Sequence, residues 1–223
     1  DASYAQYYGK TADALSRAQT PFAVVGQDDD FFFTEGLQDA VDFLSANEEY
    51  IACNGRIDNF IIKPDTNIPY GTDVKFIQNP ADESIEDKTA AERTWKHFCN
   101  YTHTLYSVYR TEVLRKNYDT LCKFNFTNLI LHELILSFLT VAQGIVKREN
   151  KFYLLRQINP GSSSNRAEHK KKGDYLDRML VESWSTEFTQ FVNSVAEIIS
   201  DKDKIELSGA QQLVKKGYRQ YLI

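Results

Sequence analysis

Three consecutive carboxylates, Asp28, Asp29 and Asp30, lie between a short apolar run and the aromatic run Phe31–Phe33. Adjacent anions repel one another, and apolar flanks imply partial burial, which disfavours charge further. A divalent cation would offset this cost. Oxygen ligands suit Mg2+ or Mn2+, which keep coordination positions open for substrate phosphates. The same residues also fit a solvated acidic turn, or a helix N-cap formed by Asp30 or Thr34, so spacing alone leaves both interpretations open.

Glu133 is the second candidate for chemistry. It lies within the most apolar predicted helix, Leu129–Gly144. An unpaired buried carboxylate is costly, and such groups often mark functional sites. The alternative is a carboxylate on the helix surface, paired with His132 or a nearby lysine.

Arg56 follows a predicted strand, Tyr50–Asn54, in the turn Asn54-Gly55-Arg56. Such a turn could aim the guanidinium at the acids or at a phosphate. A surface charge at the end of a strand is the interpretation that the residues themselves favour. Further along the chain, a loop of small polar residues at 158–173 has the composition of a mobile lid over a ligand, but it fits a solvated linker better.

The elements around the acids indicate an α/β fold. A helix at Tyr4–Ala18 is followed by Phe22–Gly26, a continuous apolar run typical of a strand covered on both faces, which favours a parallel sheet flanked by helices. In such sheets ligands bind beyond the carboxyl ends of the strands, where the acids would lie. Further strands are predicted at Phe60–Ile62, Asp73–Gln78, His103–Tyr109 and Lys151–Gln157, and further helices at Glu35–Ala46, Ser84–Phe98, Asp174–Ser200 and from Ser208 onward.

Composition sets the broad class. The chain has 223 residues, 42% of them hydrophobic and 26% charged, with a net charge of −5. This predicts a folded domain and argues against a nucleic-acid binder held by phosphate contacts. No stretch reaches the ~20 apolar residues of a membrane span. Three cysteines without a close pair form neither a disulfide framework nor a zinc site, so we expect a cytoplasmic protein.

The order of these features resembles a known family. Thr20–Val25, the acids with Phe31, and a helix ending in Phe43-Leu44 look like the metal-binding segment of GT-A glycosyltransferases, in particular a bacterial subfamily with an Asp-Asp-Asp-Phe run. Tyr106–Leu114 is similar to the acceptor-side strand and Arg turn of inverting members. His132–Leu136 is similar to their Glu-Asp-x-x-Leu motif, with His132 at its first position. The resemblance covers residues 4–157.

The resemblance implies a GT-A-like, Rossmann-like fold with a mixed, mainly parallel sheet flanked by helices. Residues 1–157 would form the catalytic domain, 158–173 a lid and 174–223 a helical extension. The family has nucleotide-binding strands before the acids, and only one helix precedes them here, so we expect that part to be missing. The C-terminal helices could pack on the domain, dimerise or lie on the inner face of the membrane; we favour packing.

The resemblance also implies a function, that of a metal-dependent inverting glycosyltransferase in bacterial surface polysaccharide synthesis. Asp28 and Asp30 would hold Mg2+ or Mn2+ on the diphosphate of a nucleotide-sugar donor, with Asp29 beside them. Glu133 would be the general base toward a glycan or lipid-linked acceptor, and His169 would complete the metal shell. The alternatives are a non-catalytic sugar-binding or scaffold module, and a sugar nucleotidyltransferase, which would need a Gly-rich phosphate loop near the start of the chain.

Overall fold

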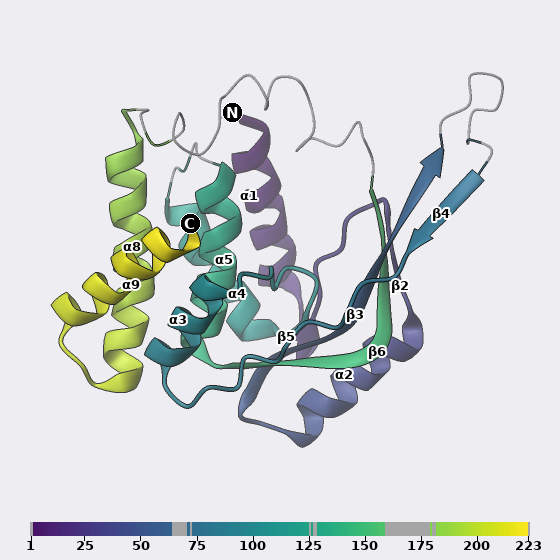
Figure 1. Cartoon of the computed structure of the whole chain (residues 1–223), viewed down its shortest axis with the longest axis horizontal. Coiled ribbons are helices and arrows are strands. Elements are labelled where there is room, and N and C mark those ends of the chain that lie inside the picture. Colours follow the sequence, from purple (N-terminus) through teal and green to yellow (C-terminus); the bar gives the residue numbers. More distant parts are fainter. Residues whose placement is uncertain are drawn as a thin grey trace.

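The computed structural model describes residues 2–63, 71, 73–124, 126, 129–158, 179 and 182–222. These form a mixed α/β fold in which one curled sheet lies beside a group of helices (Figure 1). The strands are β1 (Phe22–Ala23), β2 (Asp30–Phe32), β3 (Tyr50–Lys63), β4 (Asp73–Ile77), β5 (Val108–Arg110) and β6 (Ile145–Gln157). The helices are α1 (Ala2–Arg17), α2 (Thr34–Ala46), α3 (Ala90–Cys99), α4 (Thr111–Lys123), α5 (Leu129–Gln143), α8 (Trp184–Asp203) and α9 (Leu207–Tyr221).

The expectation of a mainly parallel sheet was wrong. The strand order is β1-β5-β3-β6-β2, with β4 on β3, and among the described strands only β3 and β6 run parallel. The other four pairings are antiparallel. The apolar run Phe22–Gly26 suggested a strand covered on both faces, but only Phe22 and Ala23 pair, half-buried at the edge beside β5. The apolar side chains of this run instead pack against two hydrophobic clusters. Ala23 and Val25 contact one cluster, and Phe22 and Val24 contact the other.

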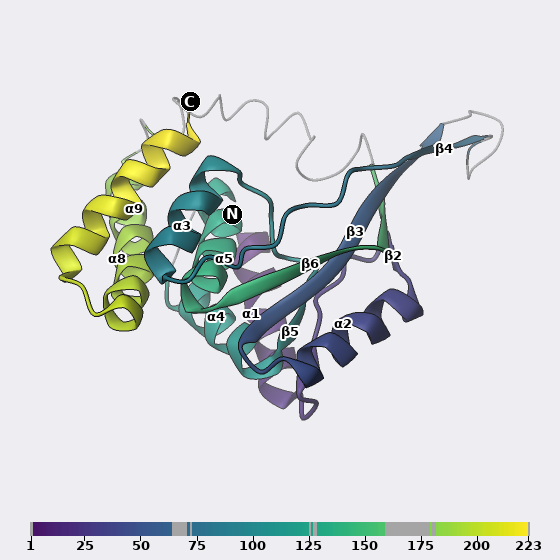
Figure 2. The same cartoon turned by 60° about the horizontal axis from the view of Figure 1, so that its bottom comes forward.

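Strand β3 runs through the predicted turn at Asn54-Gly55-Arg56. The glycine is needed there for a close approach of β6: a Cβ at Gly55 would lie 2.6 Å from the Cβ of Tyr153. The pairing with β6 is irregular at the same place, with register shifts on either side of Arg56. Beyond it, β3 and β4 form a hairpin that projects from the body of the protein, as Figure 2 shows.

The C-terminal helices pack on the rest of the chain, which confirms the interpretation that we favoured. Side chains of α8 and α9 share one hydrophobic core with α3, α4 and α5. The carboxylate of Asp203, at the end of α8, accepts hydrogen bonds from the backbone N–H groups of Ala90 and Ala91 at 2.8 and 2.7 Å. It therefore joins the last part of the chain to the first turn of α3. None of the helices in the described ranges is long and apolar enough to cross a membrane.

Gly217 marks the tightest contact between α9 and α3. A Cβ at this position would lie 2.7 Å from Cε2 of Phe98, whose ring is held by stacking on Phe138 at 3.9 Å. We expect Gly217→Ala to lower the free energy of unfolding by about 1–3 kcal/mol, because overpacking forces neighbours to shift. Gly209→Ala in the same helix is the control, since no atom lies within 4 Å of its Cβ. Helix propensity should make that variant more stable by up to ~1 kcal/mol. Urea unfolding measures the free energy of unfolding of both variants. Equal changes in the two variants would contradict the prediction.

Candidate active site

The three acids lie in the connection between β1 and β2. Asp28 is exposed and Asp29 half-buried, both in a turn, and Asp30 begins β2. Oδ1 of Asp30 accepts a hydrogen bond from the backbone N–H of Gln157 at 3.2 Å. Oδ2 is buried without a hydrogen-bond partner in the described part of the chain. Burial raises the pKa of Asp30, and the Tyr106 hydroxyl, the Gln157 N–H and the charge of Arg156 oppose that rise. The charged form of Asp30 is therefore stabilised by Tyr106, Gln157 and Arg156, while its Oδ2 is covered by protein.

Glu133 lies on α5, far from the acids in sequence. Every position from Leu131 to Ala142 is buried except Glu133, which is exposed. The expectation of a buried carboxylate was therefore wrong: the protein surface opens at this one position. His132 does not pair with it, because its ring packs on Tyr8 and Phe126 with centroids 4.9 and 5.5 Å away.

The protein around Glu133 changes the pKa of its carboxyl group. Desolvation by the surrounding protein raises the pKa of Glu133 above its ordinary value of 4.5. The charge of Arg156 and the hydroxyl of Tyr101 act in the opposite direction, stabilising the carboxylate. A raised pKa makes a carboxylate a stronger base toward the proton of a hydroxyl group.

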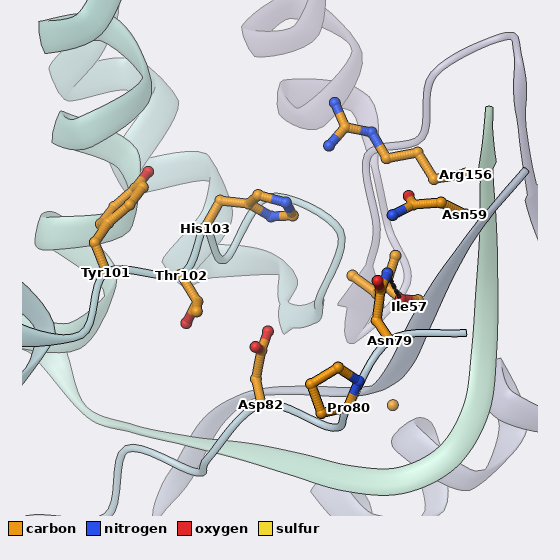
Figure 3. Close-up of a pocket in the computed structure, with 10 residues that line it drawn as sticks. Ile57, Asn59, Asn79, Pro80, Asp82, Tyr101, Thr102, His103 and Arg156 are labelled. Atoms are coloured by element: carbon orange, nitrogen blue, oxygen red, sulfur yellow. Dashed lines mark hydrogen bonds between the residues drawn. The ribbon is translucent and has the colours of Figure 1, made fainter. Parts of the chain in front are cut away.

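A hollow of about 430 Å³, here called the central hollow, lies between the sheet and the segment that follows α3. Side chains from three parts of the chain point into it (Figure 3). Strands β3 and β6 supply Asn59 and Arg156, the segment after β4 supplies Asp82, and the segment after α3 supplies Tyr101 and His103. Its volume is within the range of small-molecule sites, and its mixed lining includes several side chains that can form hydrogen bonds.

Arg156 connects the two candidate carboxylates. Its side chain lines the central hollow, and its Cα is paired with that of Asp30 across β2 and β6. Its positive charge lowers the pKa of both Asp30 and Glu133. The charge of one guanidinium thus stabilises the charged form of both carboxylates, although neither is among the residues that line the central hollow.

The far wall of the central hollow is held by a buried arginine. The side chain of Arg148 is 3% exposed and pairs with Asp82 at 3.4 Å. It also donates hydrogen bonds to the backbone oxygen of Thr102, at 3.1 Å, and to the Thr102 hydroxyl. Burial, together with Arg156 and Arg148, lowers the pKa of His103 to about 4, so this ring is neutral at physiological pH. We had no reason from sequence to place Tyr101, His103 or Arg156 at a site.

None of the predicted site residues that the structure describes is among the residues that line the central hollow, neither the acids Asp28–Asp30 nor Glu133 nor Arg56. Arg56 is paired with Asp58, with Nε 3.1 Å from Oδ1, and its guanidinium lies 5.8 Å from the centre of the Phe152 ring. It does not line the hollow. His169 and the rest of the predicted lid at 159–173 lie outside the described residues.

A metal ion at the three acids would have few protein ligands. Within the described residues, no group of three or more His, Cys, Asp or Glu side chains is arranged to hold a metal ion. The carboxylates of Asp28, Asp29 and Asp30 nevertheless offer the hard oxygen ligands that Mg2+ and Mn2+ prefer. These ions are commonly bound by one or two carboxylates together with substrate phosphates. The donor set present is compatible with that arrangement.

Comparison with known proteins gives few matches. No protein-family model and no curated protein matches the chain. Among solved structures, TarS of S. aureus is similar over 96% of this chain and 42% of its own, with 16% identity and a TM-score of 0.42. A structure of TarS 1–349 is similar over 94% of this chain and 68% of its own, with 15% identity and a TM-score of 0.37. The chain thus spans less than half of the first TarS structure.

Proposed function

We propose that this protein is a metal-dependent inverting glycosyltransferase that moves a sugar from a nucleotide-sugar donor to a hydroxyl group of an acceptor. One observation carries the proposal. Asp30, in the acidic segment, and Glu133, on α5, both lie within electrostatic range of Arg156, which lines the central hollow. The resemblance of both segments to GT-A motifs also implies metal binding by the acidic segment and a general base at Glu133.

The chemistry requires a base and a means of stabilising the departing diphosphate. Glu133 takes the proton from the acceptor hydroxyl, whose oxygen attacks the anomeric carbon from the side opposite the diphosphate. The bond from carbon to phosphate oxygen breaks, the electron pair leaves with the diphosphate, and the configuration is inverted. Asp28 and Asp30, with Asp29 beside them, would hold Mg2+ or Mn2+, which when bound supplies Lewis-acid stabilisation of the diphosphate charge.

The neutral side chains of the central hollow suit a carbohydrate. Asn59, Asn79, Thr102 and the neutral His103 offer hydrogen-bond donors and acceptors of the kind that sugar hydroxyls require. We propose a glycan or lipid-linked acceptor in bacterial surface polysaccharide synthesis, on the cytoplasmic side of the membrane. The resemblance to GT-A motifs supports this part of the proposal.

The test is turnover of a panel of nucleotide-sugars by the full-length protein, with Mn2+, with Mg2+ and with EDTA. We expect hydrolysis or transfer with at least one donor, and loss of that activity with EDTA. If no donor is turned over, and if the protein binds neither nucleotide nor metal, the proposal of an enzyme is refuted. The non-catalytic sugar-binding module is then the remaining interpretation. Release of pyrophosphate from a nucleoside triphosphate and a sugar phosphate would indicate the nucleotidyltransferase instead.

A further inference from the structure

Among the described residues, the side chain of Arg156 has no hydrogen-bonded or ion-paired partner. Its guanidinium lies over the ring of Tyr106, 5.3 Å from the centroid, and its side chain is exposed to the central hollow. Within the described ranges it forms no ion pair within 4.0 Å. The stacking fixes the plane of the guanidinium while leaving its N–H groups available.

Other arginines near the sheet are already engaged by the protein. Arg56 is paired with Asp58, and Arg148 with Asp82 and Thr102. Arg110 donates to the backbone oxygens at the end of α2 and the start of β3, at 2.8–3.0 Å. Each of these guanidinium groups donates to protein acceptors. Arg156 differs from them because it faces the central hollow and donates to no acceptor among the described residues.

We propose that Arg156 binds the phosphate oxygens of the ligand and stabilises the negative charge of the departing diphosphate. A guanidinium presents paired donors that match phosphate oxygens in a bidentate geometry. It also supplies charge where the bond to the leaving group breaks. This inference rests on the proposed function, since it names Arg156 as a second contact of the same diphosphate that the acids bind through a cation.

The neighbouring acids determine how this anion site should behave. Asp29 and Asp30 lie close enough to interact with each other and would repel a phosphate in the absence of a cation. Their neutralisation by Mn2+ removes that repulsion, so anion and metal should each strengthen the binding of the other. The register of β2 on β6, which pairs Asp30 with Arg156, places the two binding groups side by side.

The experiment is calorimetric titration of inorganic pyrophosphate into the full-length protein, with and without Mn2+. We expect Mn2+ to tighten pyrophosphate binding, and Arg156→Gln to weaken it about 10- to 100-fold in the presence of Mn2+, as loss of charge-assisted hydrogen bonds does. Arg156→Lys should retain part of the affinity. Arg17→Gln, which removes an exposed charge at the end of α1, controls for net charge and should bind as the wild type does.

The outcomes separate this inference from the proposed function. Wild-type affinity in Arg156→Gln, or loss of binding in Arg56→Gln with Arg156→Gln unaffected, would overturn the role of Arg156 even if nucleotide-sugars are turned over. Binding that depends on Arg156 without turnover of any nucleotide-sugar would support the anion site and refute the transferase. Urea unfolding of each variant shows whether it is folded, and because Arg156 is exposed, we expect wild-type midpoints.

Discussion

Glu133→Gln should lower the rate of sugar transfer by about 10²-fold or more, while the affinity for the donor stays within a few-fold of wild type. The amide keeps the size of the side chain but cannot accept the proton of the acceptor hydroxyl. Initial rates with saturating donor and acceptor measure the effect, and donor binding is measured separately by calorimetry. Glu197→Gln is the matched control, because Glu197 is an exposed glutamate on α8, away from the central hollow. Transfer near the wild-type rate would assign the base to another residue.

The pH dependence of transfer tests the same assignment. Desolvation by the surrounding protein raises the pKa of Glu133, and only its deprotonated form can act as the base. The rate should therefore fall as the pH is lowered through this raised pKa, at a higher pH than for an ordinary glutamate. Arg156→Gln removes a charge that lowers the pKa of Glu133. In that variant the fall in transfer rate on the acidic side of the pH profile should therefore occur at a still higher pH. If the rate falls at the same pH in Arg156→Gln as in the wild type, the charge of Arg156 does not affect the pKa of Glu133.

Asp30→Asn should abolish the Mn2+-dependent part of nucleotide binding and, with it, sugar transfer. The substitution keeps an oxygen that can accept from Gln157 N–H but removes the negative charge that a cation requires. Calorimetry with Mn2+ and the nucleoside diphosphate measures the loss. Asp119→Asn, an exposed position on α4, removes the same charge elsewhere and should have no effect. Unchanged nucleotide affinity with Mn2+ in Asp30→Asn would remove this residue from the metal site.

Metal affinity should also depend on pH. Burial raises the pKa of Asp30, so protons compete with the metal at a higher pH than at an ordinary aspartate. Mn2+ binding should weaken as the pH falls through the raised pKa of Asp30. In Asp30→Asn this contribution to the pH dependence of Mn2+ affinity should be absent.

The sequence identified the carboxylates of the candidate site but not their surroundings. Three adjacent acids between apolar runs, and one acid in an apolar helix, are unusual enough to be noticed without a structure. What the apolar pattern could not show is that Glu133 lies at the one exposed position of Leu131–Ala142. Hydrophobic periodicity locates a buried face, whereas an opening in that face depends on what packs opposite it.

Arg156 could not be placed from sequence, because its position depends on strand pairing. The antiparallel register of β2 on β6 brings Arg156 beside Asp30, and pairing across such a distance leaves no local signal. Arg56 showed the opposite error. A glycine before it suggested a turn, but Gly55 serves the close approach of β6, and the continuous strand directs Arg56 to Asp58. Local turn chemistry was overridden by contacts between distant segments.

The hydrogen bond between Asp30 and Gln157 spans 127 residues, and it adjoins the parallel pairing of β3 with β6. Contacts of this kind close long loops, which is entropically costly and slows folding. The candidate cation site would therefore be among the last features to form when the chain refolds. During refolding from urea, Mn2+-dependent nucleotide binding should return later than helical circular dichroism, which is acquired through contacts close in sequence.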